Sequence, residues 1–273
     1  MPETAALTSM RTRIAGQEAI AELLREQASV PRRSAPARLF GRSPLSIVSR
    51  PWYIGAEGEI AVGRELTDLP SGWTVLHALP VGTRGSDIDH IVIGPGGVFT
   101  LNTKHHANKN IWVAGRTLMV NGRKVPYLRN AEHEASRVEK MMSERMPSVT
   151  SVQPLLILVA PKHVTIREEP ERVVVLTSRQ LRRWLEKQPV VLPEPQLSAV
   201  TALLDEPGFW STPSRDRGDL SAGFAELDHE VRSARSRRRL WSGAGLVGIG
   251  AAAMGLLPLA VQLYSGLVLS VMP

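Results

Sequence analysis

Two runs of β-branched and apolar residues, joined by a turn rich in glycine and proline, constrain the fold of this chain most strongly. Residues 88–93 and 98–104 have the composition of strands, and Gly94-Pro95-Gly96-Gly97 supplies the turn. Taken as an antiparallel hairpin with these four residues as its loop, the pattern places Ile93 opposite Val98. A slip of one residue would turn every side chain to the other face, so the loop length decides which residues meet.

This register gathers four polar residues at the open end of the hairpin. Asp89 falls opposite Asn102, and Asp87 falls opposite Lys104. Side chains alternate between the faces of a sheet, so all four share one face. Directly paired Cβ atoms lie roughly 4.5–5.5 Å apart, close enough for two oxygens to bind one cation. The hairpin end is therefore either a Mg²⁺ site, built from carboxylates and water, or a polar sheet end with one exposed Asp–Lys pair.

A further carboxylate, Glu59, is predicted to face the protein interior. At helical spacing it lines up with Val62, Leu66 and Leu69 on the apolar side of a helix. A carboxylate on an apolar stripe needs a partner or a metal. The alternative is an acid near the helix start that complements the helix dipole.

The order of these features resembles the nuclease-related domain (NERD), a family of the PD-(D/E)xK nuclease superfamily. The resemblance covers about residues 52–160 and rests on Gly-x-x-Gly-Glu at 55–59, Ile-Asp-His at 88–90, Gly-Pro-Gly-Gly-Val-Phe at 94–99 and x-Thr-Lys at 102–104. It implies an α/β fold of the restriction-endonuclease type, in which helices flank a mixed sheet. It also implies phosphodiester hydrolysis in DNA with Mg²⁺ or Mn²⁺ as cofactor.

By this resemblance Glu59 is the acid of the first helix, Asp89 the metal-binding aspartate and Lys104 the motif lysine. The chain departs from the family pattern at Asn102, where the family usually has Glu. An amide oxygen can coordinate a cation but brings no charge, so the substitution lowers the affinity for Mg²⁺. Asp87 projects toward the same spot in the predicted register. The predicted metal ligands are therefore Asp87, Asp89 and Asn102.

A second departure lies at Arg129–His133, which resembles an Asn-Pro-x-x-Gln helix start of the family. Asn130 is retained, and we align Ala131 with Pro and His133 with Gln. The segment predicts a helix over 131–146 capped by Asn130. The predicted nucleic-acid contacts are His106, Asn130, His133 and Arg137, with a solvated polar stripe as the alternative.

Three interpretations remain open at this point. The domain is an impaired nuclease, a nuclease whose site is rebuilt around Asp87, or a retired site that only binds nucleic acid or protein. The remaining pattern predicts a single α/β domain over residues 52–210, with further strands near 110–113, 117–120, 155–160 and 173–176, and helices near 178–188 and 196–204.

The segments on either side of this domain differ from it in composition. Residues 1–51 read as a flexible basic lead-in with one short helix near 14–27, and residues 211–239 as a polar, Arg-rich linker with a helix over 219–238. Residues 240–273 hold no charged residue in 34 positions. Because about 20 apolar residues span a bilayer, we expect a transmembrane helix within about 242–265, with a buried soluble helix or a membrane hairpin as the alternatives.

Charge predicts how this segment is oriented and where nucleic acid can bind. The arginines directly before the apolar segment are Arg232, Arg235, Arg237, Arg238 and Arg239. The positive-inside rule therefore predicts a single-pass C-terminal anchor with the domain in the cytoplasm. The net charge of +7 is spread unevenly, and residues 52–210 hold 18 basic and 17 acidic residues. Any nucleic-acid contact must therefore be a local patch. The sequence leaves the oligomeric state open.

Overall fold

The computed structural model describes residues 9–81, 87–147, 151–210 and 220–243. The chain divides into two compact units. The first, here called the sheet unit, comprises Met1–Glu26 and Ile47–Leu220, and the second, the helical unit, comprises Gln27–Ser46 and Ser221–Pro273.

The sheet unit is built on a mixed five-stranded sheet. Its strands follow the order β1-β2-β3-β7-β9, with bounds Thr74–Pro80, Asp87–Gly94, Gly97–His105, Val152–Val159 and Val174–Thr177. The pairs β1–β2 and β2–β3 are antiparallel, whereas β3–β7 and β7–β9 are parallel. Strand β7 is apolar almost throughout, as expected of a strand covered on both faces.

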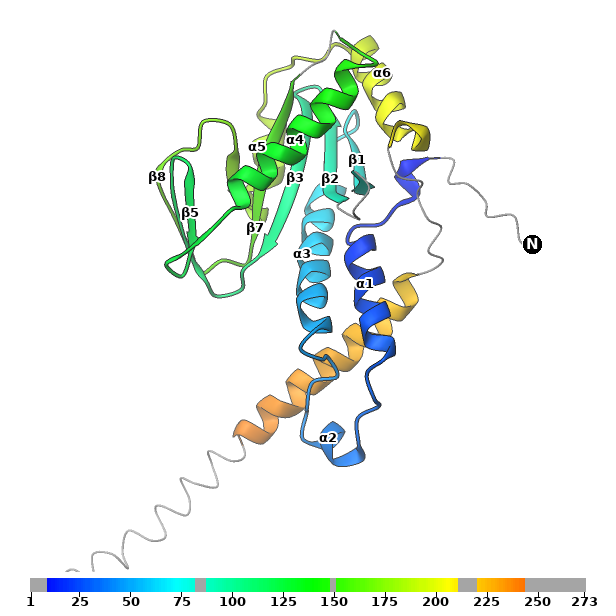
Figure 1. Ribbon diagram of the computed structural model, residues 1–273, viewed down its shortest axis with the longest axis vertical. Coiled ribbons are helices and arrows are strands. Elements are labelled where there is room, and N and C mark those ends of the chain that lie inside the picture. The colour runs from blue at the N-terminus through cyan, green and yellow to red at the C-terminus, as the bar shows by residue number, and fades with distance from the viewer. Residues whose placement is uncertain (1–8, 82–86, 148–150, 211–219, 244–273) are drawn as a thin grey trace, which may run out of the picture. The chain divides into compact units, whose positions relative to one another are not determined.

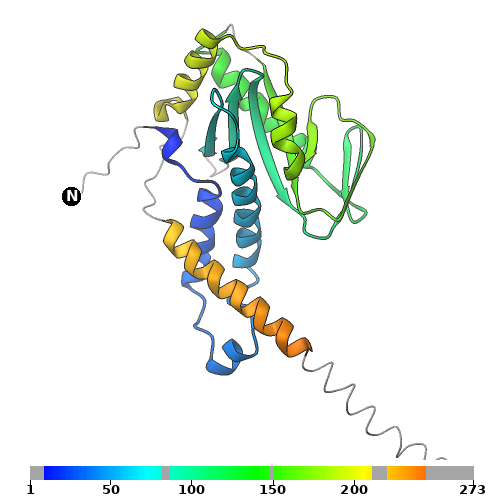
Figure 2. The ribbon, with the colours of Figure 1, turned by 180° about the vertical axis from the view of Figure 1, so that it is seen from behind.

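Helices cover both faces of this sheet. On one face α3 (Ser49–Thr67) and α5 (Ser178–Glu186) pack their apolar stripes against β3 and β7. On the other face lie α4 (Tyr127–Ser143) and α6 (Glu194–Asp205). Figure 1 shows α4 across the near face of the sheet, and Figure 2 shows α5 on the opposite face. The α/β architecture with a mixed sheet between helices is as the sequence predicted.

A second sheet of four strands adjoins the start of α4. Its order is β6-β5-β4-β8, with bounds Arg123–Val125, Thr117–Val120, Asn110–Ala114 and His163–Glu168. Asn121 and Gly122 both have positive φ, 47° and 79°, in the two-residue turn between β5 and β6. Both angles suit the type I′ turn that Asn-Gly favours. Strands β1, β6 and β8 were not anticipated from the sequence.

The β2–β3 hairpin has the predicted register. Ile93 faces Val98, but Gly94 pairs with Gly97, so the loop is the two residues 95–96 and not four. The paired positions end at His90 and Leu101. Asp87 pairs instead with Pro80 of β1. The two expected cross-strand pairs, Asp89 with Asn102 and Asp87 with Lys104, are therefore absent from the hydrogen-bonded part of the hairpin.

Helix α4 begins four residues earlier than the sequence predicted. Pro126 is its N-cap residue, and the backbone N–H of Asn130 donates to the carbonyl oxygen of Pro126 at 3.0 Å. The prediction that Asn130 caps the helix is therefore wrong, because this residue lies inside the first turns. Proline suits the start of a helix because it has no backbone N–H that would need a hydrogen-bond partner there.

The N-terminal region contains more regular structure than one short helix. A 3₁₀ turn η1 (Met10–Thr12) precedes α1 (Gln17–Ala28) and α2 (Ala35–Leu39), and a second 3₁₀ turn, η2 (Pro207–Phe209), follows α6. The large side chains of Met10, Ile20 and Leu23 are buried. These buried apolar residues explain why residues 9–28 are ordered despite the polar composition of the region around them.

The helical unit joins the α2 region to a helix over residues 221–243. The indole Nε1 of Trp241 donates to the carbonyl oxygen of Leu39 at 2.9 Å, and its ring lies 5.0 Å from that of Phe40. Arg33 pairs with Glu230 at 2.6 Å. Among the described residues no helix is both long and apolar enough to cross a membrane. From residue 244 onward the predicted membrane span lies outside the described residues.

Two glycines of α3 give a matched test of how closely this helix packs. A Cβ on Gly63 would lie 2.6 Å from the Cβ of Ala15, whereas one on Gly55 would meet nothing within 4 Å. We expect Gly63→Ala to lower the free energy of unfolding by about 1–3 kcal/mol through overpacking. Gly55→Ala should raise it by up to about 1 kcal/mol through helix propensity. Chemical denaturation measures both, and equal effects at the two positions would contradict the packing.

Candidate functional site

A cleft of about 570 Å³ lies in the sheet unit where α3, the ends of β2 and β3, and the start of α4 meet. It brings together the three residues predicted to be catalytic, Glu59, Asp89 and Lys104. The other lining residues are Ile47, Arg50, Pro51, Ile54, Gly55, Thr103, His105, His106 and Tyr127.

Asp89 lies at the centre of this arrangement. Its carboxylate accepts a hydrogen bond from the backbone N–H of Thr103 at 2.5 Å, which ties the open ends of β2 and β3 together. Burial raises the pKa of Asp89, while the Lys104 ammonium and the Thr103 hydrogen bonds oppose that rise. Asp89 is therefore a buried acid held against the strand that carries the lysine.

Glu59 reaches the cleft from α3, as its helical spacing predicted. Its neighbours Val62 and Leu66 are buried in the same helix stripe. Burial raises the pKa of Glu59 well above its usual value, and the charges of Asp89 and Asp87 raise it further. Its Oε2 is buried without a hydrogen-bond partner. A carboxyl oxygen held in this way is costly unless a cation or a proton neutralises it.

Close backbone approach explains how α3 brings Glu59 to the strand end. The residue before it is Gly58, where a Cβ would lie 3.0 Å from the Cβ of His105 and 3.5 Å from Cγ2 of Thr103. A larger residue at this position would push the helix away from β3. In the Gly58-Glu59 pair, the glycine is therefore needed for close packing and the glutamate is the residue that lines the cleft.

Lys104 points from β3 toward the start of α4. Its Nζ donates to the carbonyl oxygen of Thr103 at 3.0 Å and lies 5.5 Å from the ring centroid of Tyr127. The imidazole of His106 stacks on the same tyrosine, with centroids 5.5 Å apart and planes inclined by 22°. Lysine, histidine and tyrosine thus form one wall of the cleft.

Asn102 contacts an acid that the sequence interpretation did not include in the site. Its Nδ2 donates to Oε1 of Glu134 in α4 at 2.6 Å. Burial raises the pKa of Glu134 to about 7, and the Asp89 charge contributes to the rise. The amide of Asn102 is 5% exposed, and its Oδ1 is buried without a partner. A carboxylate therefore stands beside Asn102, supplied by a helix and not by the strand.

The sequence did contain a signal for Glu134. Counted from Asn130, the fifth position of an Asn-Pro-x-x-Gln pattern is Glu134, so the alignment of Gln with His133 was wrong. The misplaced helix start added to this error, because it put Glu134 in a first turn where an acid needs no further explanation. With the helix beginning at Tyr127, Glu134 lies one turn further in and faces β3.

Asp87 does not take the position that the hairpin register suggested. It pairs with Pro80 at the end of β1. Like Asn102 and Glu134, it lies beside the cleft's lining residues and is not one of them. Burial raises its pKa to about 7, and the charges of Asp89 and Glu18 raise it further. The carboxylate in contact with Asn102 is that of Glu134, at hydrogen-bonding distance.

The predicted nucleic-acid contacts are dispersed. His106 lines the cleft, whereas Asn130 and His133 are exposed on α4 and Arg137 is half-buried there. His90, the last residue of the Ile-Asp-His motif, is buried and shares a hydrogen bond between Nδ1 atoms with His77 at 2.8 Å. Burial, and then the His77 charge, lower its pKa. His90 is therefore a core residue behind the site.

The chemistry of the cleft suits a hard divalent cation. Glu59 Oε2 and Asn102 Oδ1 are buried oxygens without partners, and the carboxyl groups of Asp89 and Glu134 repel each other. Mg²⁺ takes oxygen ligands of these types. Within the described ranges, however, no three His, Cys, Asp or Glu side chains converge as a metal site requires. An amide oxygen or a small side-chain movement would be needed to complete the ligand set.

Comparison with known proteins agrees with this geometry. The family model described as nuclease-related domain matches residues 54–159, which include most of α3, the β2–β3 hairpin, α4 and β7. No curated protein and no solved structure matches the chain. The matched segment contains every acid of the cleft together with Lys104. Residues 54–159 thus belong to the nuclease-related domain family, which is affiliated with the PD-(D/E)xK superfamily.

Proposed function

We propose that this domain is a metal-dependent phosphodiesterase acting on nucleic acid, in which Glu134 supplies the carboxylate that Asn102 lacks. The observation that carries the proposal is the hydrogen bond of 2.6 Å from Asn102 Nδ2 to Glu134 Oε1. Where the family pattern has an acid on the strand and an amide on the helix, this chain has the amide on the strand and the acid on the helix. The pair retains one carboxylate and one amide in contact.

The exchange preserves charge at the cleft. A strand glutamate opposite a helix glutamine and a strand asparagine opposite a helix glutamate each contribute a single negative charge when the glutamate is ionised. Members of this family usually bind divalent metals. The candidate ligands here are Asp89, Glu59 and the Oδ1 of Asn102, with Glu134 adding charge next to them. A bound Mg²⁺ or Mn²⁺ would polarise the phosphodiester and lower the pKa of a coordinated water.

Lys104 supplies the positive charge on the other side of the cleft. Its ammonium, held by the Thr103 carbonyl and the face of Tyr127, is placed to stabilise charge that develops on a phosphoryl group. Asp89 fixes the lysine-bearing strand through the Thr103 N–H. His106 and Tyr127 form an aromatic wall against which a base or sugar can pack.

A second candidate function is a catalytically silent module that binds nucleic acid or protein. It is favoured by the lack, among the described residues, of three convergent His, Cys, Asp or Glu side chains. Both candidates include a domain held at the membrane on its cytoplasmic side. The support for that location is the uncharged sequence of residues 240–273 and the arginines before it.

Exchanging the acid and the amide tests the proposed function most directly. We expect wild type to cleave DNA with Mg²⁺ or Mn²⁺, and Glu134→Gln to reduce the rate roughly 10–100-fold, as for residues that support metal ligands. Asn102→Glu alone places two carboxylates in contact and should not raise the rate. The double variant Asn102→Glu/Glu134→Gln restores one acid and one amide and should regain activity. Initial cleavage rates measure all four proteins.

Controls for this series separate the competing interpretations. Glu139→Gln, on the same helix, should leave the rate unchanged. Loss of cleavage in Asp87→Asn but not in Glu134→Gln would show that the site is rebuilt around Asp87. If neither wild type nor the double variant cleaves with either metal, the phosphodiesterase proposal fails and the binding module remains.

The raised pKa of Glu134 gives a prediction that does not depend on activity. An acid whose folded-state pKa is raised from 4.5 to about 7 stabilises the fold at low pH and loses that contribution as the pH rises through 7. Glutamine stays neutral and can still accept from Asn102. In EDTA, Glu134→Gln should therefore be more stable than wild type at pH 8, by up to about 3 kcal/mol at roughly 1.4 kcal/mol per pKa unit. The gain should shrink at pH 5.

Thermal or chemical denaturation at the two pH values measures this difference. Mn²⁺ at pH 8 should raise the melting temperature of wild type more than that of Glu134→Gln, because the cation neutralises the same acids. A gain of equal size at both pH values, or the same pH profile in Glu139→Gln, would contradict the assignment.

The location proposal is tested on the full chain. We expect the protein to sediment with membranes and to require detergent for release, because the apolar C-terminal segment partitions into the bilayer. A variant truncated after residue 243 should remain in the supernatant. Release of the full chain by high salt alone would argue against a spanning segment.

A further inference from the structure

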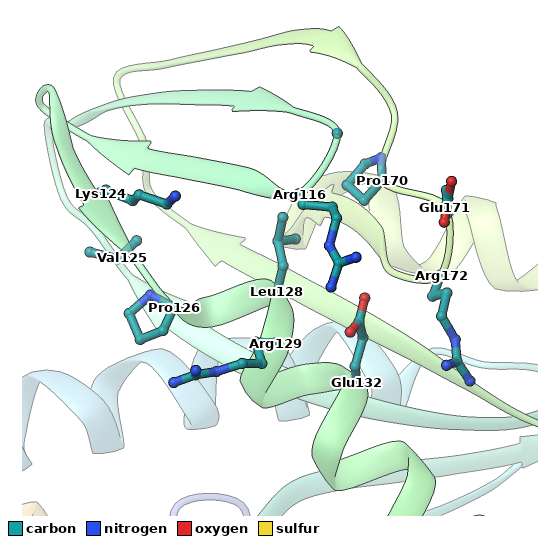
Figure 3. Close-up of a pocket in the computed structure, with 11 residues that line it drawn as sticks. Arg116, Lys124, Val125, Pro126, Leu128, Arg129, Glu132, Pro170, Glu171 and Arg172 are labelled. Carbon is teal, nitrogen blue, oxygen red and sulfur yellow. The ribbon is translucent and has the colours of Figure 1, made fainter.

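A second cavity lies on the side of the start of α4 that faces the four-stranded sheet (Figure 3). Its volume is about 700 Å³, within the range of roughly 300–1,000 Å³ that ligand sites occupy. The charged side chains that line it are four basic and two acidic ones: Arg116, Lys124, Arg129 and Arg172, with Glu132 and Glu171. The remaining lining is glycine, proline, valine and leucine.

The four basic side chains come from separate parts of the fold. Arg116 lies in the β4–β5 turn and extends toward the start of α4, with Lys124 and Arg129 on one side of it and Arg172 on the other (Figure 3). In the part of the chain described here, none of the four lies within 4.0 Å of a carboxylate oxygen. Their charges are therefore not neutralised by ion pairs within the protein.

This concentration of charge is local. Residues 52–210 have 18 basic and 17 acidic residues, so the domain as a whole is nearly neutral. The four basic and two acidic side chains around this hollow give it a net charge of +2, which makes it more positive than the domain as a whole. Such a patch attracts an anionic ligand with several charges more strongly than it attracts a single small anion.

The cavity adjoins the carboxylate cleft. Pro126 and Leu128 line the cavity, and Tyr127 between them lines the cleft together with Lys104. The two hollows share no lining residue, but the first residues of α4 line both. A polymer that places one phosphate beside Lys104 would have to pass Tyr127 to reach the cavity, whereas a small ligand in the cavity would not connect the two.

We propose that this cavity binds the phosphate backbone of the nucleic-acid strand whose reacting phosphodiester lies beside Lys104. The inference rests on the proposed function, since that function places the reacting phosphate in the cleft. Arg116, Lys124, Arg129 and Arg172 neutralise successive phosphates, and the apolar lining of Val125, Pro126 and Leu128 contacts sugar or base. These contacts position the strand without reading its sequence.

Salt-dependent binding of DNA tests the proposal separately from cleavage. The full chain in nonionic detergent and EDTA is titrated into a fluorescein-labelled DNA oligonucleotide, single-stranded and duplex, and fluorescence polarisation gives Kd at several salt concentrations. We expect Arg116→Gln/Arg172→Gln to weaken binding at least about tenfold at low salt. The slope of log Kd against log salt should fall by about two, one for each lost phosphate contact.

The control removes the same charge from the opposite face of the sheet. Arg179→Gln/Arg183→Gln on α5 should bind DNA as wild type does, and melting curves check that both double variants are folded. Equal affinity and slope in the two double variants would overturn the proposal, even if wild type cleaves DNA. Loss of binding confined to the cavity variant supports it, even if no protein cleaves.

Discussion

The register of the β2–β3 hairpin is the constraint on which the rest of the site depends. Beyond its last paired residues, His90 and Leu101, the hairpin continues to Asp89 on β2 and to Thr103 on β3, where the Asp89 carboxylate accepts from the Thr103 N–H. Helix α3 can then bring Glu59 to the strand end because Gly58 has no side chain. A slip of one residue would turn the lysine and the amide toward the other layer of helices. Every polar contact in the cleft follows from this one pairing.

The buried acids in and beside the cleft are costly to the fold. Burial raises the pKa of Glu59, Asp87, Asp89 and Glu134, and their mutual repulsion contributes to several of these shifts. A protein selected for stability alone would replace such groups with apolar ones. Buried acids with shifted pKa values that gather in one place are typical of functional sites. The cavity beside α4 has the opposite sign, since its lining holds four basic and two acidic side chains.

Much of this arrangement was predictable because local chemistry determines it. The turn at 94–97, the alternation of β2 and β3, and the apolar stripe through Glu59 each depend on residues near in sequence, and the structure confirms them. The start of α4 was misplaced because Asn130 resembles an N-cap, although Pro126 takes that position. Glu134 was missed because its role depends on contact with Asn102, 32 residues away. Pairings at that separation are set by packing between layers, which periodicity does not reveal.

The bond between Asn102 and Glu134 does more than restore a charge. An amide has one donor end and one acceptor end, and rotation by half a turn would exchange them. Donation from Nδ2 to Glu134 fixes that orientation, so Oδ1 points to the other side, where it is buried without a partner. In the proposed function Glu134 therefore has two roles, through its own charge and by fixing the direction of the asparagine oxygen. A strand glutamate, whose two oxygens are equivalent, would need no such neighbour, which is why the strand amide and the helix acid are best understood as one unit.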